Sequence, residues 1–126
     1  MARVTGAREA SSELLRLARR SPKAMERAMY KYGNEEMTEA KRLTPVEFGD
    51  LRDSGVVDAP EWVGEVLAME LGFGGAAEAY AAAVHEDMEA YHEHGQAKFL
   101  EAPLNASEPY FDQRVGNDFA KFVGIE

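Results

Sequence analysis

The chain has 126 residues, of which 45% are hydrophobic and 29% are charged, a composition typical of one soluble globular domain spanning residues 1–126. No cysteine occurs, so disulfides, thiolate metal sites and cysteine nucleophiles are excluded. The net charge of −9 makes free nucleic acid a poor partner, and no apolar run approaches the roughly 20 residues of a membrane helix.

The charge is distributed unevenly along the chain. Residues 1–43 carry ten Lys or Arg against six Asp or Glu, whereas residues 44–126 carry four against seventeen. A basic N-terminal third and an acidic remainder can meet within one chain or between neighbouring chains. A solvated mixed helix followed by an acidic body explains the same distribution, so the sequence leaves both interpretations open.

The first third of the chain has the apolar spacing of three and four residues that is typical of helices. Ser21-Pro22 interrupts the pattern with a residue that caps helix N-termini and one that is favoured in the first helical turn. We therefore predict one helix over residues 7–19 and a longer one over residues 22–43. Residues 1–20 form either a helical arm or the first limb of a long helix that is kinked near Ser21-Pro22.

Thr44-Pro45 should end the long helix, because the residue before a proline disfavours helical backbone. A loop is expected over residues 46–54. Beyond it, Val56-Val57 and residues 66–73 have the character of strands, the second with apolar side chains at alternate positions. With a turn near residues 61–64, these two strands predict a small antiparallel hairpin.

The segment over residues 76–93 is ambiguous, since its alanines favour helix while alternate apolar positions suit a strand. A short apolar element follows over residues 98–104. A C-terminal helix is predicted from Ser107, a good capping residue, to Val123. Helix, then strands, then helix indicates an α+β fold.

Two sets of apolar side chains are predicted to form the core. The strand should bury one face, because its side chains alternate between opposite faces of the sheet. The C-terminal helix should bury an apolar stripe. The residues expected inside are Leu67, Met69 and Leu71 on the strand, and Phe111, Val115, Phe119 and Phe122 or Val123 on the helix.

One constellation resembles a metal site. If its segment is helical, His85, Glu89 and His92 lie on one face at positions i, i+4 and i+7, and two imidazoles with a carboxylate can bind zinc or iron. The spacing is not HExxH, and no general base stands beside the ligands. Histidines in an acidic segment are more often solvated surface residues. We therefore expect neither a catalytic residue nor a cofactor, and keep a metal-dependent enzyme as an alternative.

Two stretches carry a resemblance to a known family. Residues 44–54 read TPVEFGDLRDS, and the second stretch begins with GFGG at residues 72–75. It continues with YAAAVHE at residues 80–86 and GQAKFLE at residues 95–101. In order and spacing, these blocks resemble the minor capsid or tail-completion proteins that join heads to tails in long-tailed phages. The resemblance covers about residues 20–123.

The resemblance implies a long N-terminal helix, a small antiparallel sheet and a C-terminal helix, with Tyr80–His85 as a strand or extended edge. It also implies a non-enzymatic virion protein at the head–tail junction, present in the host cytoplasm during assembly. Six or twelve copies would form a ring between the portal-side connector or stopper and the tail-terminator or tail-tube proteins. Packaged DNA would be passing cargo only, with no membrane contact.

Candidate interface residues follow from the charge asymmetry and from the resemblance. A basic helix of one subunit is expected to contact the acidic body of the next, and the loops of the second block are expected to contact neighbouring rings. An oligomeric adaptor outside any virion remains an alternative to this interpretation. The candidate interface residues are Arg16, Arg19, Arg20, Arg27, Phe73, His85, Glu86, Lys98 and Phe99.

Overall fold

The computed structural model describes residues 4–45, 49–74, 85–86 and 98–124 of the chain. The fold is α+β, as predicted. The strands are β1 Val4–Glu9, β2 Val56–Val57, β3 Glu61–Val63 and β4 Val66–Phe73. The helical elements are α1 Ser12–Ala18, α2 Pro22–Leu43, α3 Gly49–Asp53, α5 Glu101–Ser107, the 3-10 turn η2 Glu108–Tyr110 and α6 Phe111–Gly124.

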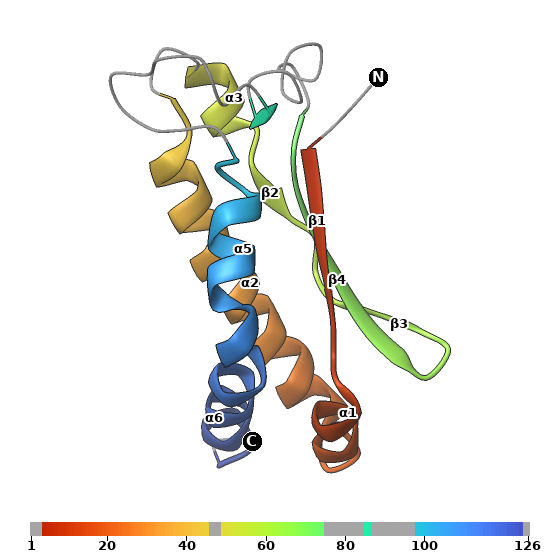
Figure 1. Ribbon diagram of the computed structural model, residues 1–126. Coiled ribbons are helices and arrows are strands. Elements are labelled where there is room, and N and C mark those ends of the chain that lie inside the picture. Colours follow the sequence, from red (N-terminus) through yellow and green to blue (C-terminus); the bar gives the residue numbers. More distant parts are fainter. Residues whose placement is uncertain (1–3, 46–48, 75–84, 87–97, 125–126) are drawn as a thin grey trace.

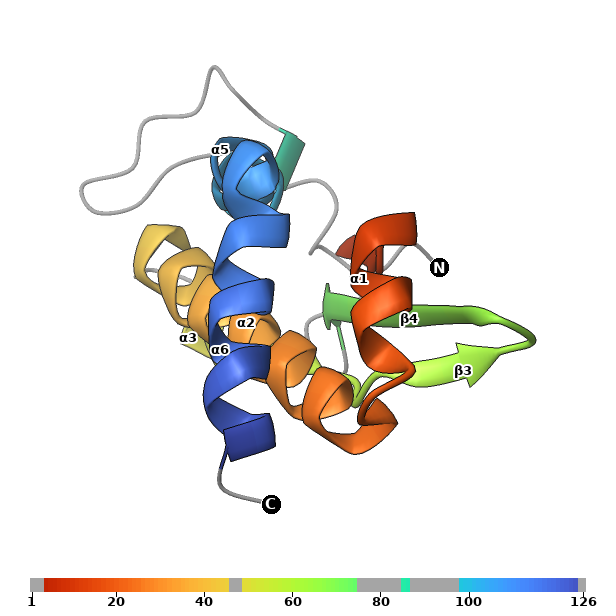
Figure 2. The same ribbon diagram turned by 90° about the horizontal axis from the view of Figure 1, so that it is seen from below.

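The strands form one antiparallel sheet, in which β4 pairs with β1 along one edge and with β2 and β3 along the other. Figure 1 shows α2 running beside the continuous α5–η2–α6 column, while the β3–β4 hairpin extends away from these helices. Seen from below, the helices gather on one side of the sheet, with α1 next to β4 (Figure 2). The molecule is therefore a helical layer packed on a small sheet.

Helix α2 begins and ends where the sequence predicted. Ser21 caps its N-terminus, with Oγ accepting a hydrogen bond from the Ala24 amide at 3.1 Å, and Pro22 occupies the first turn. At the other end, the Thr44 hydroxyl donates to the Ala40 carbonyl at 2.9 Å. The buried face of α2 includes Met25, Met29 and Tyr32. The predicted helix over residues 22–43 is confirmed.

The predicted helix over residues 7–19 is wrong in its first part. Residues Val4–Glu9 form β1, which pairs with β4 from Val4 opposite Phe73 to Glu9 opposite Ala68. Helix α1 starts only after Ser11, whose Oγ accepts from the Leu14 amide at 3.1 Å. Residues 4–18 are thus a strand and a short packed helix, not an extended helical arm, because pairing with a distant strand overrides local helix propensity.

Two glycines allow the layers to approach closely. A Cβ on Gly6 of β1 would clash with Leu104 of α5. A Cβ on Gly33 of α2 would lie 2.7 Å from Sδ of Met69 and 2.9 Å from Cγ1 of Val57. At Gly6, the backbone of β1 therefore packs directly against Leu104, and at Gly33 the backbone of α2 packs directly against the sheet. A side chain at either position would prevent this close approach.

Strand β4 supplies the centre of the core. Its alternate residues Leu67, Met69, Leu71 and Phe73 are all buried, which confirms the predicted core face of this strand. The predicted turn over residues 61–64 is wrong, since residues 61–63 form β3. The chain reverses instead at Gly64 and Glu65. Gly64 has a positive φ of 64°, which suits glycine.

Two further predictions need correction. The loop expected over residues 46–54 contains α3, and its residues 46–48 lie outside the described part of the chain. His85 has helical backbone together with Glu86, so the extended conformation expected for the end of Tyr80–His85 is wrong at His85. The remainder of that segment lies outside the described residues.

The C-terminal helix begins later than predicted. Helix α6 starts at Phe111, and η2 and α5 precede it without a break, so Ser107 lies within a helical column and makes no capping hydrogen bond. The predicted apolar stripe is nevertheless confirmed. Phe111, Val115 and Phe119 are buried, and Phe122 and Val123 pack partly buried against the same core.

Candidate interaction surfaces

Three exposed arginines lie at the junction of α1 and α2. Arg16 is in the last turn of α1, Arg19 caps its C-terminus, and Arg20 occupies the turn before Ser21. The carbonyl end of a helix favours positive charge, so the local sequence suits this position. Among the described residues, none of the three makes an ion pair. We call Arg16, Arg19 and Arg20 the basic corner.

Arg27, the fourth predicted interface arginine, is placed differently. Its guanidinium lies 4.3 Å from the centroid of the Phe122 ring, a cation–π contact between α2 and α6. Arg27 therefore contacts its own subunit and is separate from the basic corner.

A hollow of about 750 Å³ separates the basic corner from the β3–β4 hairpin. Leu15 and Pro22 contribute apolar surface to it from the helices. Trp62 of β3 lines the opposite wall, with its indole N–H donating to Glu26 of α2 at 3.1 Å. The basic corner thus borders an accessible, partly apolar depression.

Three of the predicted interface residues form a buried aromatic cluster instead. The Phe99 ring makes edge-to-face contacts with Phe73, at 5.0 Å between centroids, and with His85, at 4.8 Å. Phe73 and Phe99 have no exposed surface, and His85 is 6% exposed. Interface roles for the side chains of Phe73 and Phe99 are therefore wrong, because both belong to the core of the subunit.

Glu86 and Lys98 lie at the surface beside this cluster and bind each other. The Lys98 ammonium is hydrogen-bonded to Glu86 and lies 3.3 Å from the carboxylate of Glu101. The hydrogen bond between Glu86 and Lys98 lowers the pKa of the carboxyl and raises the pKa of the ammonium. Both predicted interface residues are thus accessible, yet already paired within the chain.

His85 has a structural role in the described part of the chain. Its Nε2 accepts a hydrogen bond from the Glu101 amide at 3.3 Å, and its carbonyl accepts from the Lys98 amide at 2.6 Å. Burial lowers the pKa of His85 below the ordinary value of 6.5, against the opposing influence of Glu86 at 3.4 Å from Nδ1. His85 therefore joins its own segment to the start of α5.

Of the alternative metal site at His85, Glu89 and His92, the structure describes only His85. Glu89 and His92 lie outside the described residues. Within the described ranges, no group of three or more histidine and acidic side chains is arranged to hold a metal ion.

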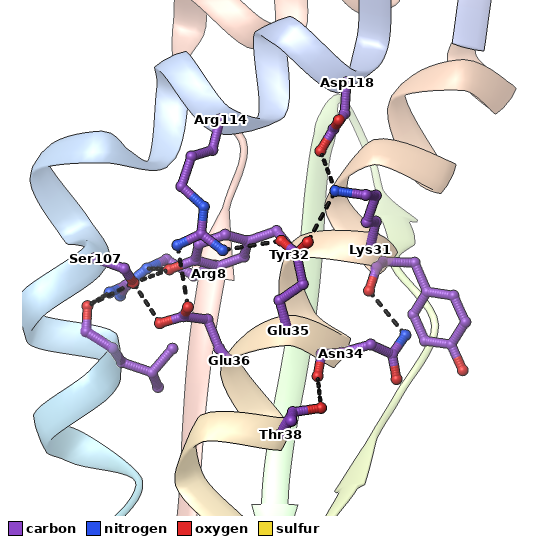
Figure 3. Close-up of polar contacts among 12 residues, drawn as sticks. Arg8, Lys31, Tyr32, Asn34, Glu35, Glu36, Thr38, Ser107, Arg114 and Asp118 are labelled. Carbon is purple, nitrogen blue, oxygen red and sulfur yellow. Dashed lines mark hydrogen bonds and ion pairs between the residues drawn. The ribbon is translucent and has the colours of Figure 1, made fainter. Parts of the chain in front are cut away.

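A polar network that the sequence did not predict crosses the helical layer (Figure 3). Ser107 of α5 donates to Oε1 of Glu36 on α2 at 2.6 Å, and its Oγ lies 2.7 Å from the Tyr32 hydroxyl. Tyr32 also accepts from Nε of Arg8 on β1 at 3.3 Å. Arg114 of α6 donates to Oε2 of Glu36 at 3.1 Å. Residues of four elements therefore share one network, and its central carboxylate, Glu36, is 6% exposed and binds side chains of α5 and α6.

The network continues to the surface of α2 and α6. Arg114 also donates to Glu35 at 3.0 Å, and the Lys31 ammonium binds both Glu35, at 2.8 Å, and Asp118, at 2.9 Å. Burial opposes ionisation of Glu35, but the hydrogen bonds from Lys31 and Arg114 outweigh it and lower the pKa. Hydrogen bonds to both acids raise the pKa of Lys31. These contacts hold α6 against α2.

A groove of about 460 Å³ between α2 and the α5–η2 segment opens beside this network. Its polar lining includes Glu36, to which Ser107 and Arg114 both donate, and Glu39, which is paired with Arg42. A nucleophile needs a free general base beside it, but the Ser107 hydroxyl is buried and shared between Tyr32 and Glu36. The polar residues of the groove therefore connect the helices that form it.

The sequence contained one signal for this network. Met25, Met29, Tyr32, Glu36 and Ala40 recur at spacings of three and four, so Glu36 lies on the buried stripe of α2. A carboxylate on such a stripe requires hydrogen-bond partners. Its partners are far away in the sequence, which no local pattern reveals.

The two sequence blocks that carry the phage resemblance meet in space. Ser54, at the end of the first block, accepts a hydrogen bond from the Gly74 amide of the second at 3.0 Å. Leu51 of the first block is fully buried, as are Phe73 and Phe99 of the second. Figure 1 shows α3 and residues 85–86 at one end of the molecule. The described residues of both blocks thus build one end of the fold.

Comparisons of the chain with protein-family models, with curated proteins and with solved structures found no match. Of the helices in the described ranges, none combines the length and the apolar character that crossing a membrane requires.

Proposed function

We propose that this chain is a structural subunit of a tailed-phage virion that joins the DNA-filled head to the tail. The observation that carries the proposal is the ordered pair of sequence blocks at residues 44–54 and 72–101 that resembles head–tail joining proteins. The hydrogen bond between Ser54 and Gly74 supports it, because the two blocks act as one packed unit in this fold. The proposed role is assembly and not catalysis.

In the proposed assembly, six or twelve copies form a ring stacked between the portal-side connector or stopper and the tail-terminator or tail-tube proteins. The basic corner, which makes no ion pair within the described residues, supports a head-to-tail contact between copies, since a heterologous interface closes into a ring by rotation. The overall net charge of −9 suits a channel wall past which DNA moves without binding. The working location is the virion, after assembly in the host cytoplasm.

Deletion of the gene from the phage that carries it tests this proposal. The expected result by electron microscopy is a mixture of DNA-filled heads and separate tails, with joined particles restored when the wild-type gene is supplied in trans. Joined, infectious particles without the gene would overturn the proposal.

A further inference from the structure

One face of the sheet is uncovered by the described helices. Helices α2 and α5 pack against the face that contains Gly6 and Leu71, as the close approaches of Gly33 to Met69 and of Gly6 to Leu104 show. The alternate residues of each strand face the opposite side. On that side, antiparallel pairing sets Ala7 opposite Glu70 and Val63 opposite Val66. We call this side the open sheet face.

The open sheet face combines apolar side chains with acids that make no ion pair in the described part of the chain. Its exposed apolar residues include Val56, Val63 and Val66, which are 48%, 67% and 36% exposed. Its acidic residues surround the small side chains of Ala7 and Ala68. They are Glu9 and Glu61, which both lie opposite Ala68, and Glu70 with its cross-strand neighbour Asp58.

Carboxylates on adjacent strands repel one another, and this repulsion destabilises the sheet unless a positive charge lies close to them. Asp58 and Glu70 are such neighbours, since the Asp58 amide donates to the Glu70 carbonyl at 2.9 Å. Within the described part of the chain, neither acid makes an ion pair. Exposed valines beside unpaired acids suit a partner that offers both apolar surface and cations.

The basic corner offers both cations and apolar surface, but it lies on the other side of its own sheet. Two of its residues, Arg16 and Arg19, line a hollow together with Trp62, whose register partner Leu67 faces the core. The hollow adds apolar surface from Leu15 and Pro22 to the charge of the arginines. Because the corner and the open sheet face point to opposite sides of the sheet, they complement each other between copies rather than within one.

We propose that the open sheet face of one subunit receives the basic corner of a second copy of this chain, as the repeating contact of the ring. The inference deepens the proposed function and rests on it, because it assigns the acidic partner of the basic corner. One contact patch differs from the other, so the association is heterologous and propagates around a ring.

Cysteine cross-linking tests the contact directly, because the chain has no native cysteine. A variant with both Arg20→Cys and Glu70→Cys is incorporated into joined particles and oxidised. The expected result on a non-reducing gel is a ladder of covalent oligomers. Each single-cysteine variant should instead give only the band of the single chain, without cross-links. Joined particles that contain the double variant but give no ladder would overturn the inference and leave the head–tail function intact. Dimers from either single variant would also overturn it, since they indicate a two-fold contact.

Charge exchange keeps the inference testable if the cysteine variants do not assemble. Glu61→Lys with Glu70→Lys should abolish joined particles while the purified chain stays folded. Adding Arg19→Glu and Arg20→Glu to this variant should restore joining, because each charge then meets its opposite. A folded fourfold variant that restores no joined particles would overturn the contact, whereas joining that persists after gene deletion would overturn the head–tail function itself.

Discussion

The Ser107 hydroxyl lies 2.6 Å from Oε1 of Glu36 and donates a hydrogen bond to it, which joins two helices whose contacting residues are 71 positions apart. A buried carboxylate without partners is strongly destabilising, so this bond and the one from Arg114 are conditions for packing α2 against α5 and α6. Ser107, which was expected to cap a helix, makes no capping hydrogen bond, and its hydroxyl donates to Glu36 instead.

Replacing Ser107 by alanine should therefore destabilise the fold. The change leaves Oε1 of the buried Glu36 without its hydrogen-bond donor and leaves the Tyr32 hydroxyl with Arg8 alone, which should lower the free energy of unfolding by about 1–3 kcal/mol. Chemical denaturation measures the effect. Ser12→Ala, at an exposed position at the start of α1, is the matched control, and equal stability of the two variants would contradict the role of Ser107.

Leu71 tests the assignment of the core face of β4. Its side chain has no exposed surface, so Leu71→Ala should lower the free energy of unfolding by about 2–5 kcal/mol through lost burial and a cavity. Val66→Ala, on the open sheet face of the same strand, should change it by less than about 0.5 kcal/mol. A loss below about half a kilocalorie for Leu71→Ala would show that the faces are reversed.

The sequence predicted the elements whose signals are local. Ser21-Pro22 and Thr44 set both ends of α2, and the alternation over residues 66–73 set the core face of β4. Strand β1 was missed because residues 7–10 have good helix propensity, and its hydrogen bonds come from β4, more than fifty residues away. Ser11 was the available signal, because it is a good helix-capping residue. It caps α1, so the helix starts after it and the residues before it are not part of that helix.

The candidate site was less predictable than the fold, because burial depends on packing between distant segments. Arg19 and Arg20, predicted at an interface, are exposed, since they follow a helix end and precede a cap. Phe73 and Phe99 were placed at an interface, yet both lie in the core, where their rings make an edge-to-face contact between distant segments. The open sheet face could be inferred only from strand register, which the sequence alone did not supply.

Gly116 offers a stabilising substitution. It lies inside α6, and a Cβ added there meets no atom within 4 Å, so Gly116→Ala should raise the free energy of unfolding by about 0.5–1 kcal/mol through lower chain entropy in the unfolded state. Gly33→Ala is the contrasting variant, because its Cβ would crowd Met69 and Val57. The midpoints of thermal and of chemical unfolding should therefore rise for Gly116→Ala and fall for Gly33→Ala.

His85 should make stability depend on pH. Because burial lowers its folded pKa below 6.5, the unfolded chain binds more protons than the folded chain between that lowered pKa and 6.5. The contribution of His85 to stability is therefore complete above pH 6.5 and decreases as the pH falls through this window. Glu86, Lys98 and Glu101 are the charged groups around it and remain in every variant compared.

His85→Gln isolates this dependence. Glutamine can still accept the hydrogen bond from the Glu101 amide but does not titrate, so the variant should be less stable at neutral pH and have a flatter stability profile below pH 6.5. The difference between the two proteins in free energy of unfolding, measured by denaturation at several pH values, removes the contributions of His92 and His94, which both proteins share. Parallel profiles would contradict a lowered pKa at His85.

The basic corner provides the prediction that bears most directly on assembly. Arg19 and Arg20 are exposed and make no ion pair among the described residues, so reversing their charge should leave the fold of the subunit intact. A single exposed ion pair contributes less than about 1 kcal/mol, but a ring repeats the contact at every interface, so the small contributions accumulate. Arg19→Glu with Arg20→Glu should therefore abolish head–tail joining, leaving full heads and free tails by electron microscopy. Arg19→Lys with Arg20→Lys keeps the charge and should support normal plaque yield, whereas normal yield from the glutamate variant would eliminate the basic corner as a contact.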